Sequence, residues 1–269
     1  MTAVIIVLLV IAAVYLYSIQ GRTGHEGLAA LRGWGYAHRG LHGKGVPENS
    51  MAAFRAALDG GYGIELDVHL MKDGNLAVIH DPSLKRTAGA DIEIEDLTTR
   101  ELAKYKLENT EETIPTLRQV LDLYKGKAPL IVELKPQRGN HAALAQAACA
   151  MLDTYRGAYC IESFDPRCVL WLRKNRPDLI RGQLAENFVK NKRSALPFVL
   201  RFILTHQLGN FMVLPDFVSY KFADRRNLSN ILVCKLWGVQ GVTWTITSQA
   251  DYDTAVAEGW IPIFEGFRP

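Results

Sequence analysis

The stretch that most constrains the fold is Ile64–Pro82, which reads IELDVHLMKDGNLAVIHDP. Its first half alternates strictly between apolar and charged residues. Because side chains along a strand point alternately to opposite faces, this pattern predicts a strand with one apolar and one charged face. The Asp73-Gly74 pair is a strong hairpin signal, so we expect Leu76–His80 to return antiparallel. The hairpin would carry His80 back towards the charged face.

Two carboxylates lie on that charged face. Glu65 and Asp67 are two residues apart, which places them about 7 Å apart along a strand. Flexible side chains at this spacing can close on one ion, and two carboxylates at one site repel unless a cation or a proton intervenes. Oxygen ligands suit a hard cation, so we expect one divalent cation, Mg²⁺ or Ca²⁺. The alternative is the solvated face of an exposed hairpin.

Length and composition favour one large domain. The chain has 269 residues, 48% hydrophobic and 22% charged. A (β/α)₈ barrel typically needs about 250 residues. The net charge of +3 is too small to indicate nucleic acid, and we expect no nucleic-acid partner. The four cysteines show no metal-binding spacing, which favours reduced core residues and a cytosolic setting for the folded part.

The N-terminal segment differs from the rest of the chain. Residues 2–20 contain no charged side chain. That length is near the lower limit for a membrane-spanning helix, about 17–25 residues. We therefore predict a transmembrane anchor over residues 1–20 and a tether over residues 21–33; the alternative is a buried helix of the domain. Arg22 and Arg32 follow the segment, so the positive-inside rule predicts a single-pass cell-membrane protein whose C-terminal domain lies in the cytoplasm.

Polar residues gather at strand ends past the tether. Tyr36–Gly40 reads as a short strand that ends in His-Arg, and a glycine-rich loop follows. Asn49 or Ser50 is placed to cap the helix Met51–Leu58, after which the strand of the hairpin begins. This is a β-loop-α-β unit with polar residues at the strand ends. Barrel enzymes carry their chemistry at that face of the barrel.

Eight segments read as barrel strands, and the antiparallel arm Leu76–His80 is not one of them. They alternate with helical segments, which predicts a (β/α)₈ TIM barrel over residues 34–269 with an insertion at about 82–115. Glu133 interrupts an apolar run; an inward carboxylate there needs a partner, and a salt bridge to Lys135 is the alternative to a metal. The predicted strands are Gly35–His38, Gly63–Val68, Leu130–Leu134, Tyr159–Ser163, Ile180–Leu184, Phe217–Tyr220, Gly241–Thr245 and Ile261–Phe264.

Several motifs together make the sequence resemble the glycerophosphodiester phosphodiesterase family. Each motif alone is weak, but their order and spacing cover nearly everything from about residue 34 to the end. The motifs are His38-Arg39-Gly40, Pro47-Glu48-Asn49, Ala53-Phe54, Glu65-Leu66-Asp67-Val68, Lys72-Asp73-Gly74, His80-Asp81, Leu84–Gly89, Val132–Pro136 and Val242–Thr245. The resemblance implies metal-dependent hydrolysis of glycerophosphodiesters to glycerol phosphate and an alcohol, in glycerophospholipid metabolism.

The resemblance and the residue chemistry together assign roles to ten side chains. The divalent cation is expected on Glu65, Asp67 and Glu133. His38 and His80 are expected to exchange protons, because imidazole titrates near neutral pH. Among the expected substrate-binding residues, Arg39 and Lys135 hold the phosphate. Glu48, together with Asn49, orients His38 and its loop. Trp244 forms an apolar wall for the glycerol. His42, His69, His141 and His206 receive no catalytic role.

Two departures from a plain barrel of this family leave alternatives open. Residues 190–193 are basic, and Ala195–Leu204 is apolar except for a proline and an arginine. It is either a barrel helix with a core extension or an interfacial element against a membrane. The chain ends in Phe264–Pro269 where a Thr-Asp-x-Pro sequence is expected, which leaves head-group recognition open there. The alternative functions are lysophospholipase D-like cleavage of a lysophospholipid and, remotely, an inactive membrane scaffold.

Overall fold

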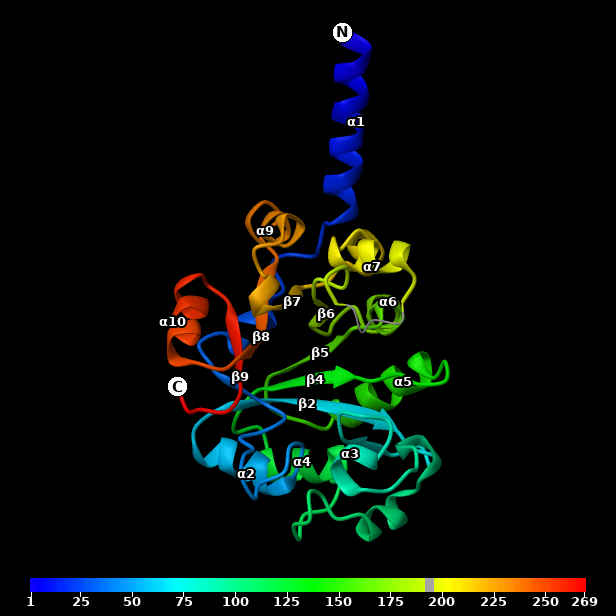
Figure 1. Ribbon diagram of the computed structural model, residues 1–269, viewed down its shortest axis with the longest axis vertical. Helices are drawn as coiled ribbons and strands as arrows, with labels where there is room; N and C mark the ends of the chain where they lie inside the picture. Colours follow the sequence, from blue (N-terminus) through cyan, green and yellow to red (C-terminus); the bar gives the residue numbers. More distant parts are fainter. Residues whose placement is uncertain (192–195) are drawn as a thin grey trace.

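Eight parallel strands close into a barrel in the computed structural model, which describes residues 1–191 and 196–269 (Figure 1). Each strand pairs in parallel with the next, and β1 pairs with both β2 and β9, so the sheet closes on itself. The barrel strands are β1 (Tyr36–His38), β2 (Gly63–Leu70), β4 (Leu130–Leu134), β5 (Tyr159–Ser163), β6 (Arg181–Ala185), β7 (Phe217–Lys221), β8 (Gln240–Ile246) and β9 (Ile261–Phe264). The predicted TIM barrel is confirmed, with the strand bounds within about two residues.

Helices follow the strands and cover the outside of the barrel (Figure 1). Local sequence sets where they begin: the Ser50 hydroxyl accepts a hydrogen bond from the amide of Ala53, and Thr116 forms a capping box with Gln119. The α-helices that pack around the strands are α2 (Met51–Asp59), α4 (Leu117–Tyr124), α5 (His141–Leu152), α6 (Pro166–Asn175), α7 (Phe198–Thr205), α8 (Asn210–Val213), α9 (Leu228–Lys235) and α10 (Gln249–Ala257). The main core lies between this layer and the barrel strands.

The hairpin predicted from the alternating stretch is present. The short strand β3 (Leu76–Val78) pairs antiparallel with the end of β2, and Val78 lies opposite Val68. The following residues, 82–115, are fully described and contain only the short helices α3 (Lys85–Ala88), η2 (Ile94–Asp96) and η3 (Thr99–Lys104). Apolar side chains of this segment, including Leu84 and Leu102, pack with Met71 into a small core of their own.

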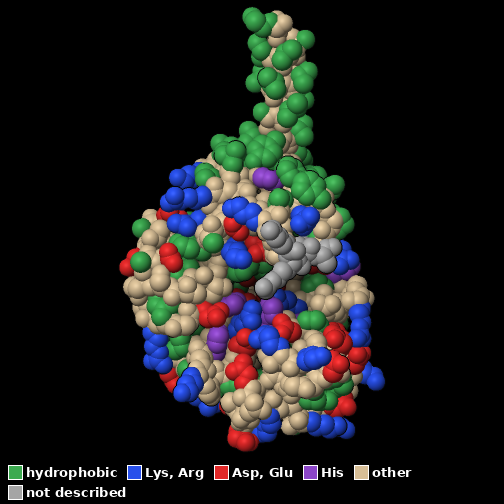
Figure 2. Space-filling view, viewed as in Figure 1, with side chains coloured by type: hydrophobic (Ala, Val, Ile, Leu, Met, Phe, Trp, Pro, Cys, Tyr) green, Lys and Arg blue, Asp and Glu red, His purple; other side chains and the backbone are tan. Residues whose placement is uncertain are grey.

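The N-terminal segment forms the helix α1 (Thr2–Ser18), which projects from the body of the molecule (Figure 1). Its first thirteen residues, Thr2–Val14, are all exposed, and hydrophobic side chains cover its length (Figure 2). Among the residues that the structure describes, no helix combines the length and the apolar character of a membrane span. The transmembrane helix predicted over residues 1–20 is therefore not supported.

The segment predicted as a tether, residues 21–33, packs under the barrel instead. Ile19, at the end of the predicted anchor, is completely buried next to β7, and Arg22 in the predicted tether pairs with the buried carboxylate of Asp216. The helix η1 (Glu26–Leu31) places Leu28 and Leu31 among buried side chains at the N-terminal ends of the strands. Apolar residues in this stretch thus close the bottom of the barrel, which a flexible linker would leave open.

Candidate active site

Three carboxylates meet inside the barrel, at the positions that the strand pattern predicted. Glu65 and Asp67 are on β2 and Glu133 is on β4, where parallel register sets Glu133 directly beside Asp67. One oxygen from each side chain lies within 4.8 Å of one oxygen of each of the others. All three side chains are buried. The alternative of a solvated hairpin face is therefore wrong.

Burial and mutual repulsion make this cluster unfavourable without a cation. Burial, followed by the charges of Asp67 and Glu133, raises the pKa of Glu65 well above its usual value. Burial also raises the pKa of Glu133 to about 7, against the attraction of Lys135. Carboxylates that resist ionisation together are stabilised when a cation lies among them. The donor set, three carboxylates, is the kind that Mg²⁺ and Ca²⁺ prefer.

Two basic side chains lie beside the carboxylates. The ammonium of Lys135 is 3.3 Å from Asp67 and 2.9 Å from Glu133, so the salt bridge considered for Lys135 does form. The guanidinium of Arg39 is 3.6 Å from Asp67. Burial raises the pKa of Asp67, but Lys135, His80 and Arg39 outweigh it and hold that pKa well below the usual range. Lys135 and Arg39 therefore surround an ionised Asp67 with positive charge.

His38 ends β1 and points into the same site. Its Nε2 is 3.9 Å from a carboxylate oxygen of Glu65. Its Nδ1 is 2.5 Å from a carboxylate oxygen of Glu265, which directly follows β9. The hydrogen bond to His38 lowers the pKa of Glu265 despite partial burial, so this carboxylate is ionised. A carboxylate on Nδ1 fixes the ring and leaves Nε2 for the substrate.

His80 has a matching partner on the hairpin side. Its Nδ1 is 2.6 Å from a carboxylate oxygen of Asp81, and burial lowers the pKa of the imidazole. Asp81 is also bonded to Arg86, which reaches across to Glu48 at 2.6 Å. Both histidines thus carry a carboxylate on Nδ1 and present Nε2.

Two residues of the Pro-Glu-Asn motif have partners that differ from the prediction. We expected Glu48 and Asn49 to orient His38 and its loop. Glu48 instead pairs with Arg39 at 2.9 Å as well as with Arg86. The amide of Asn49 donates to Asp67 at 2.9 Å. These residues hold the cationic and acidic parts of the site, because both side chains are already occupied by groups other than His38.

The histidines without a predicted role are accounted for in part. His69 shares the β2 strand with the carboxylates but is completely buried, with Nδ1 2.7 Å from Glu95. Its Nε2 lies 3.2 Å from the backbone oxygen of His80. Both ring nitrogens are therefore engaged, and His69 holds the segment after β3 on which His80 lies.

Aromatic rings form one side of the site. The ring of Phe164 lies 5.9 Å from the Lys135 ammonium, 5.5 Å from the Trp244 ring and 6.0 Å from the Phe188 ring. Trp244 is held by a hydrogen bond from its indole N–H to the backbone oxygen of Ser219. An open cavity of about 300 Å³ borders this wall and is also lined by His80, Glu133 and Lys135. The cavity therefore combines charged groups with an apolar surface.

Three residues of the site escaped the sequence prediction. Glu265 reaches His38 over 227 residues of sequence and carries no local signal. Arg86 belongs to the Leu84–Gly89 motif, but its contact with Glu48 spans 38 residues and was not predicted. Glu162 lies beside Glu133 on β5, and burial and repulsion from Glu133 raise its pKa well above the usual value. Its signal was available: like Glu133, it is a carboxylate within an apolar strand.

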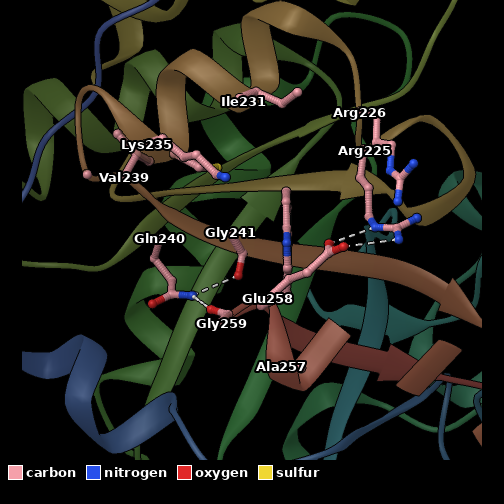
Figure 3. A pocket seen from close by; sticks show the side chains of 13 residues that line it. Arg225, Arg226, Ile231, Lys235, Val239, Gln240, Gly241, Ala257, Glu258 and Gly259 are labelled. Carbon is pink, nitrogen blue, oxygen red and sulfur yellow. Dashed lines mark hydrogen bonds and ion pairs between the residues drawn. The ribbon is translucent and has the colours of Figure 1, made fainter. Parts of the chain in front are cut away.

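A second cavity, of about 590 Å³, lies on the outside of the barrel between α9 and α10. Figure 3 shows Arg225 paired with Glu258 on one side and the amide of Gln240 bonded to the backbone of Gly241 and Gly259 on the other. None of the predicted site residues lines it. This cavity is separate from the carboxylate cluster.

Comparisons with known proteins agree with this geometry. Residues 38–264 match the Glycerophosphoryl diester phosphodiesterase family. A glycerophosphodiester phosphodiesterase of Caldanaerobacter subterraneus is 30% identical over 83% of this chain and 89% of its own. A lysophospholipase D of Rattus norvegicus is 32% identical over 45% of this chain and 41% of its own.

Solved structures share the fold. A phosphodiesterase of Oleispira antarctica, solved in complex with the product sn-glycerol-3-phosphate, superimposes with a TM-score of 0.69. It is 23% identical and covers 91% of this chain and 95% of its own. The match to the family runs over most of the chain and includes every predicted site residue. This protein is therefore an enzyme, a phosphodiesterase, and belongs to the glycerophosphoryl diester phosphodiesterase family.

Proposed function

We propose that this enzyme hydrolyses glycerophosphodiesters to glycerol phosphate and an alcohol with the help of a divalent cation, in glycerophospholipid metabolism. The observation that carries the proposal is the buried cluster of Glu65, Asp67 and Glu133, with Lys135 and Arg39 at its edge. His38 lies near Glu65, and His80 lies near Asp67. A phosphodiester needs these three things: a cation, donors for its oxygens and groups that move protons.

The residues present suit the cation that the family implies. Glu65, Asp67 and Glu133 would hold it. The raised pKa values of Glu65 and Glu133 reflect the crowded negative charge that the cation would neutralise. When bound, a divalent cation polarises a phosphoryl oxygen as a Lewis acid. Lys135 and Arg39 bind the other phosphate oxygens through charge-assisted hydrogen bonds.

The two histidines divide the proton transfers. Each has its Nδ1 on a carboxylate, Glu265 for His38 and Asp81 for His80, so each acts through Nε2. One imidazole takes the proton of the attacking hydroxyl, and the other gives a proton to the oxygen of the leaving alcohol. The aromatic wall with Trp244 shields the glycerol from water.

We further propose that the attacking group is the neighbouring hydroxyl of the substrate's own glycerol. Its oxygen forms the new bond to phosphorus as the bond to the alcohol breaks, and water then opens the cyclic phosphate. The test is phosphorus NMR of the products from glycerophosphocholine and from its analogue without that hydroxyl, with and without EDTA. Glycerol phosphate in the first case and no turnover in the second are expected. Normal turnover of the deoxy analogue would mean that water attacks directly.

A second candidate function is release of the head group from a lysophospholipid. The aromatic wall of Phe164, Phe188 and Trp244 favours it, because this surface suits an acyl glycerol better than free glycerol. Two relatives named lysophospholipase D are 32% and 34% identical over part of the chain. The same NMR assay with lysophosphatidylcholine distinguishes the two substrates by their rates.

We also propose that the enzyme acts at a cell membrane with its barrel on the cytoplasmic side. The exposed apolar surface of α1 supports the membrane, and Arg22 and Arg32 after it support the orientation. Arg22 contributes weakly, since its charge is neutralised by Asp216. Protease treatment of intact cells tests the orientation: digestion of the barrel from outside would reverse it.

A further inference from the structure

An apolar surface lies beside the base of α1. Exposed side chains on α7 and α8 form it: Phe198, Val199, Leu200, Phe202 and Met212. Figure 2 shows hydrophobic side chains gathered where α1 meets the body of the molecule. Phe198 is 60% exposed and Val199 is 66% exposed. A contiguous exposed apolar surface of this kind indicates an interaction site.

Contacts join this surface to α1. The rings of Tyr17 and Phe211 lie 5.6 Å apart, just before Met212. The hydroxyl of Ser229 on α9 is 2.8 Å from the hydroxyl of Tyr15 and 3.2 Å from His206 at the end of α7. The apolar faces of α1, α7 and α8 therefore form one continuous surface, which we call the apolar collar.

The collar also connects to the active site. Phe188, in the aromatic wall, is followed by Val189, whose backbone N–H donates to the hydroxyl of Thr205 at the end of α7. Phe164 links Phe188 to Lys135 at the phosphate end of the site. A chain of contacts thus joins Lys135, beside the carboxylate cluster, through the aromatic wall to the end of α7.

We propose that the apolar collar docks on a phospholipid surface and that the enzyme takes its lipid phosphodiester substrate from there, an inference that rests on the proposed function. Lipid fits better than a protein partner because α1 is apolar on all sides, as helices in hydrocarbon are. Across α1, α7 and α8 the sequence has no acidic residue and one basic residue, Arg201. Docking would therefore bury no carboxylate, and Arg201 can reach lipid phosphates. Part of the predicted interfacial segment, residues 192–195, lies outside the described residues.

The test compares two substrates with the full-length chain. Val199→Asp places a charge in the collar, and Val256→Asp places one on an equally apolar position of α10 that is 52% exposed and belongs to another face. We expect Val199→Asp to lower the rate on lysophosphatidylcholine in phosphatidylcholine vesicles about tenfold, the loss of roughly one buried Val. The rate on dissolved glycerophosphocholine should stay unchanged, and Val256→Asp should change neither rate.

Hydrogen exchange supplies a readout that does not depend on catalysis. Phosphatidylcholine vesicles should slow exchange in α7 of the wild-type protein and leave α10 unaffected. Slowed exchange together with no activity on either substrate would support the docking and refute the proposed function. Unchanged exchange in α7 would overturn the docking. Loss of both activities in Val199→Asp and also in Phe198→Ser would overturn it too, since the face would then serve catalysis. An oligomer that Val199→Asp converts to monomers would identify the occupant as a second copy of the chain.

Discussion

The substitution Glu65→Gln separates the two roles of the carboxylate cluster. It removes one negative charge and leaves the side-chain volume nearly unchanged. Two ionised carboxylates 4.8 Å apart, the widest separation within the cluster, repel by about 3.5 kcal/mol at an effective dielectric constant of about 20. Because burial, followed by this repulsion, already raises the pKa of Glu65, protonation of Glu65 relieves part of the repulsion before the substitution is made. The metal-free variant should therefore be at least as stable as the wild-type protein.

The response to a divalent cation should move in the opposite direction. A ligand at one hundred times its Kd stabilises the folded state by about 2.7 kcal/mol. In a domain of this size each kcal/mol raises Tm by about 2–4 °C. Saturation with Mg²⁺ or Ca²⁺ should therefore raise the Tm of the wild-type protein by about 5–11 °C, and should leave that of Glu65→Gln almost unchanged.

Differential scanning calorimetry in EDTA and in excess Mg²⁺ or Ca²⁺ measures both effects. Glu162→Gln is the matched control, because Glu162 is an equally buried barrel carboxylate outside the cluster of three. The control should keep the shift in Tm, while Glu65→Gln should lose it together with activity. An equal shift in Glu65→Gln, or full wild-type activity in EDTA, would refute the assignment of the metal site.

Three other predictions concern the histidines, the N-terminal segment and the thiols. Replacement of either His38 or His80 by Ala should lower kcat/KM by about 10²–10⁴-fold, and unaltered steady-state rates would exclude a proton-transfer role. Deletion of residues 1–14, which are exposed, should leave the free energy of unfolding unchanged. Deletion of residues 1–20 should lower the free energy of unfolding by about 2–5 kcal/mol, because Ile19 is lost from the core. Urea titration of both forms measures the difference. Burial raises the pKa of Cys149 to about 11 and those of Cys168 and Cys234 to about 12. A thiol reagent at pH 8 should therefore label these residues slowly until the protein is unfolded. Fast labelling of the native protein would contradict this burial.

The sequence was sufficient where function follows from strand geometry. Glu65 and Asp67 could be assigned to one face because side chains on a strand have a period of two. Glu133 could be assigned to the interior because a carboxylate in an apolar strand needs a partner. Parallel register between β2 and β4 then brings Asp67 and Glu133 side by side. The catalytic roles of these residues remain predictions that the experiments above test.

The sequence was insufficient where contacts depend on closure of the barrel. Glu265 reaches His38 because β9 pairs with β1, and no local pattern records that pairing. Glu48 was assigned to His38 because of its position in the chain, yet two arginines compete for it more strongly. The apolar N-terminal segment predicted an anchor and a tether, but composition alone does not reveal that Ile19 and Leu28 find partners in the barrel.

The packed segment beneath the barrel has a mechanical consequence. Ile19 is buried, Arg22 bonds both Asp216 and the backbone oxygen of Leu179, and Trp237 donates to the backbone of Leu16. These contacts fix the C-terminal end of α1 against the barrel. Whatever holds α1 therefore also sets the direction in which the catalytic mouth faces. The active site can then meet its substrate only in a limited range of orientations. A flexible insertion after Ser18 would remove that restriction.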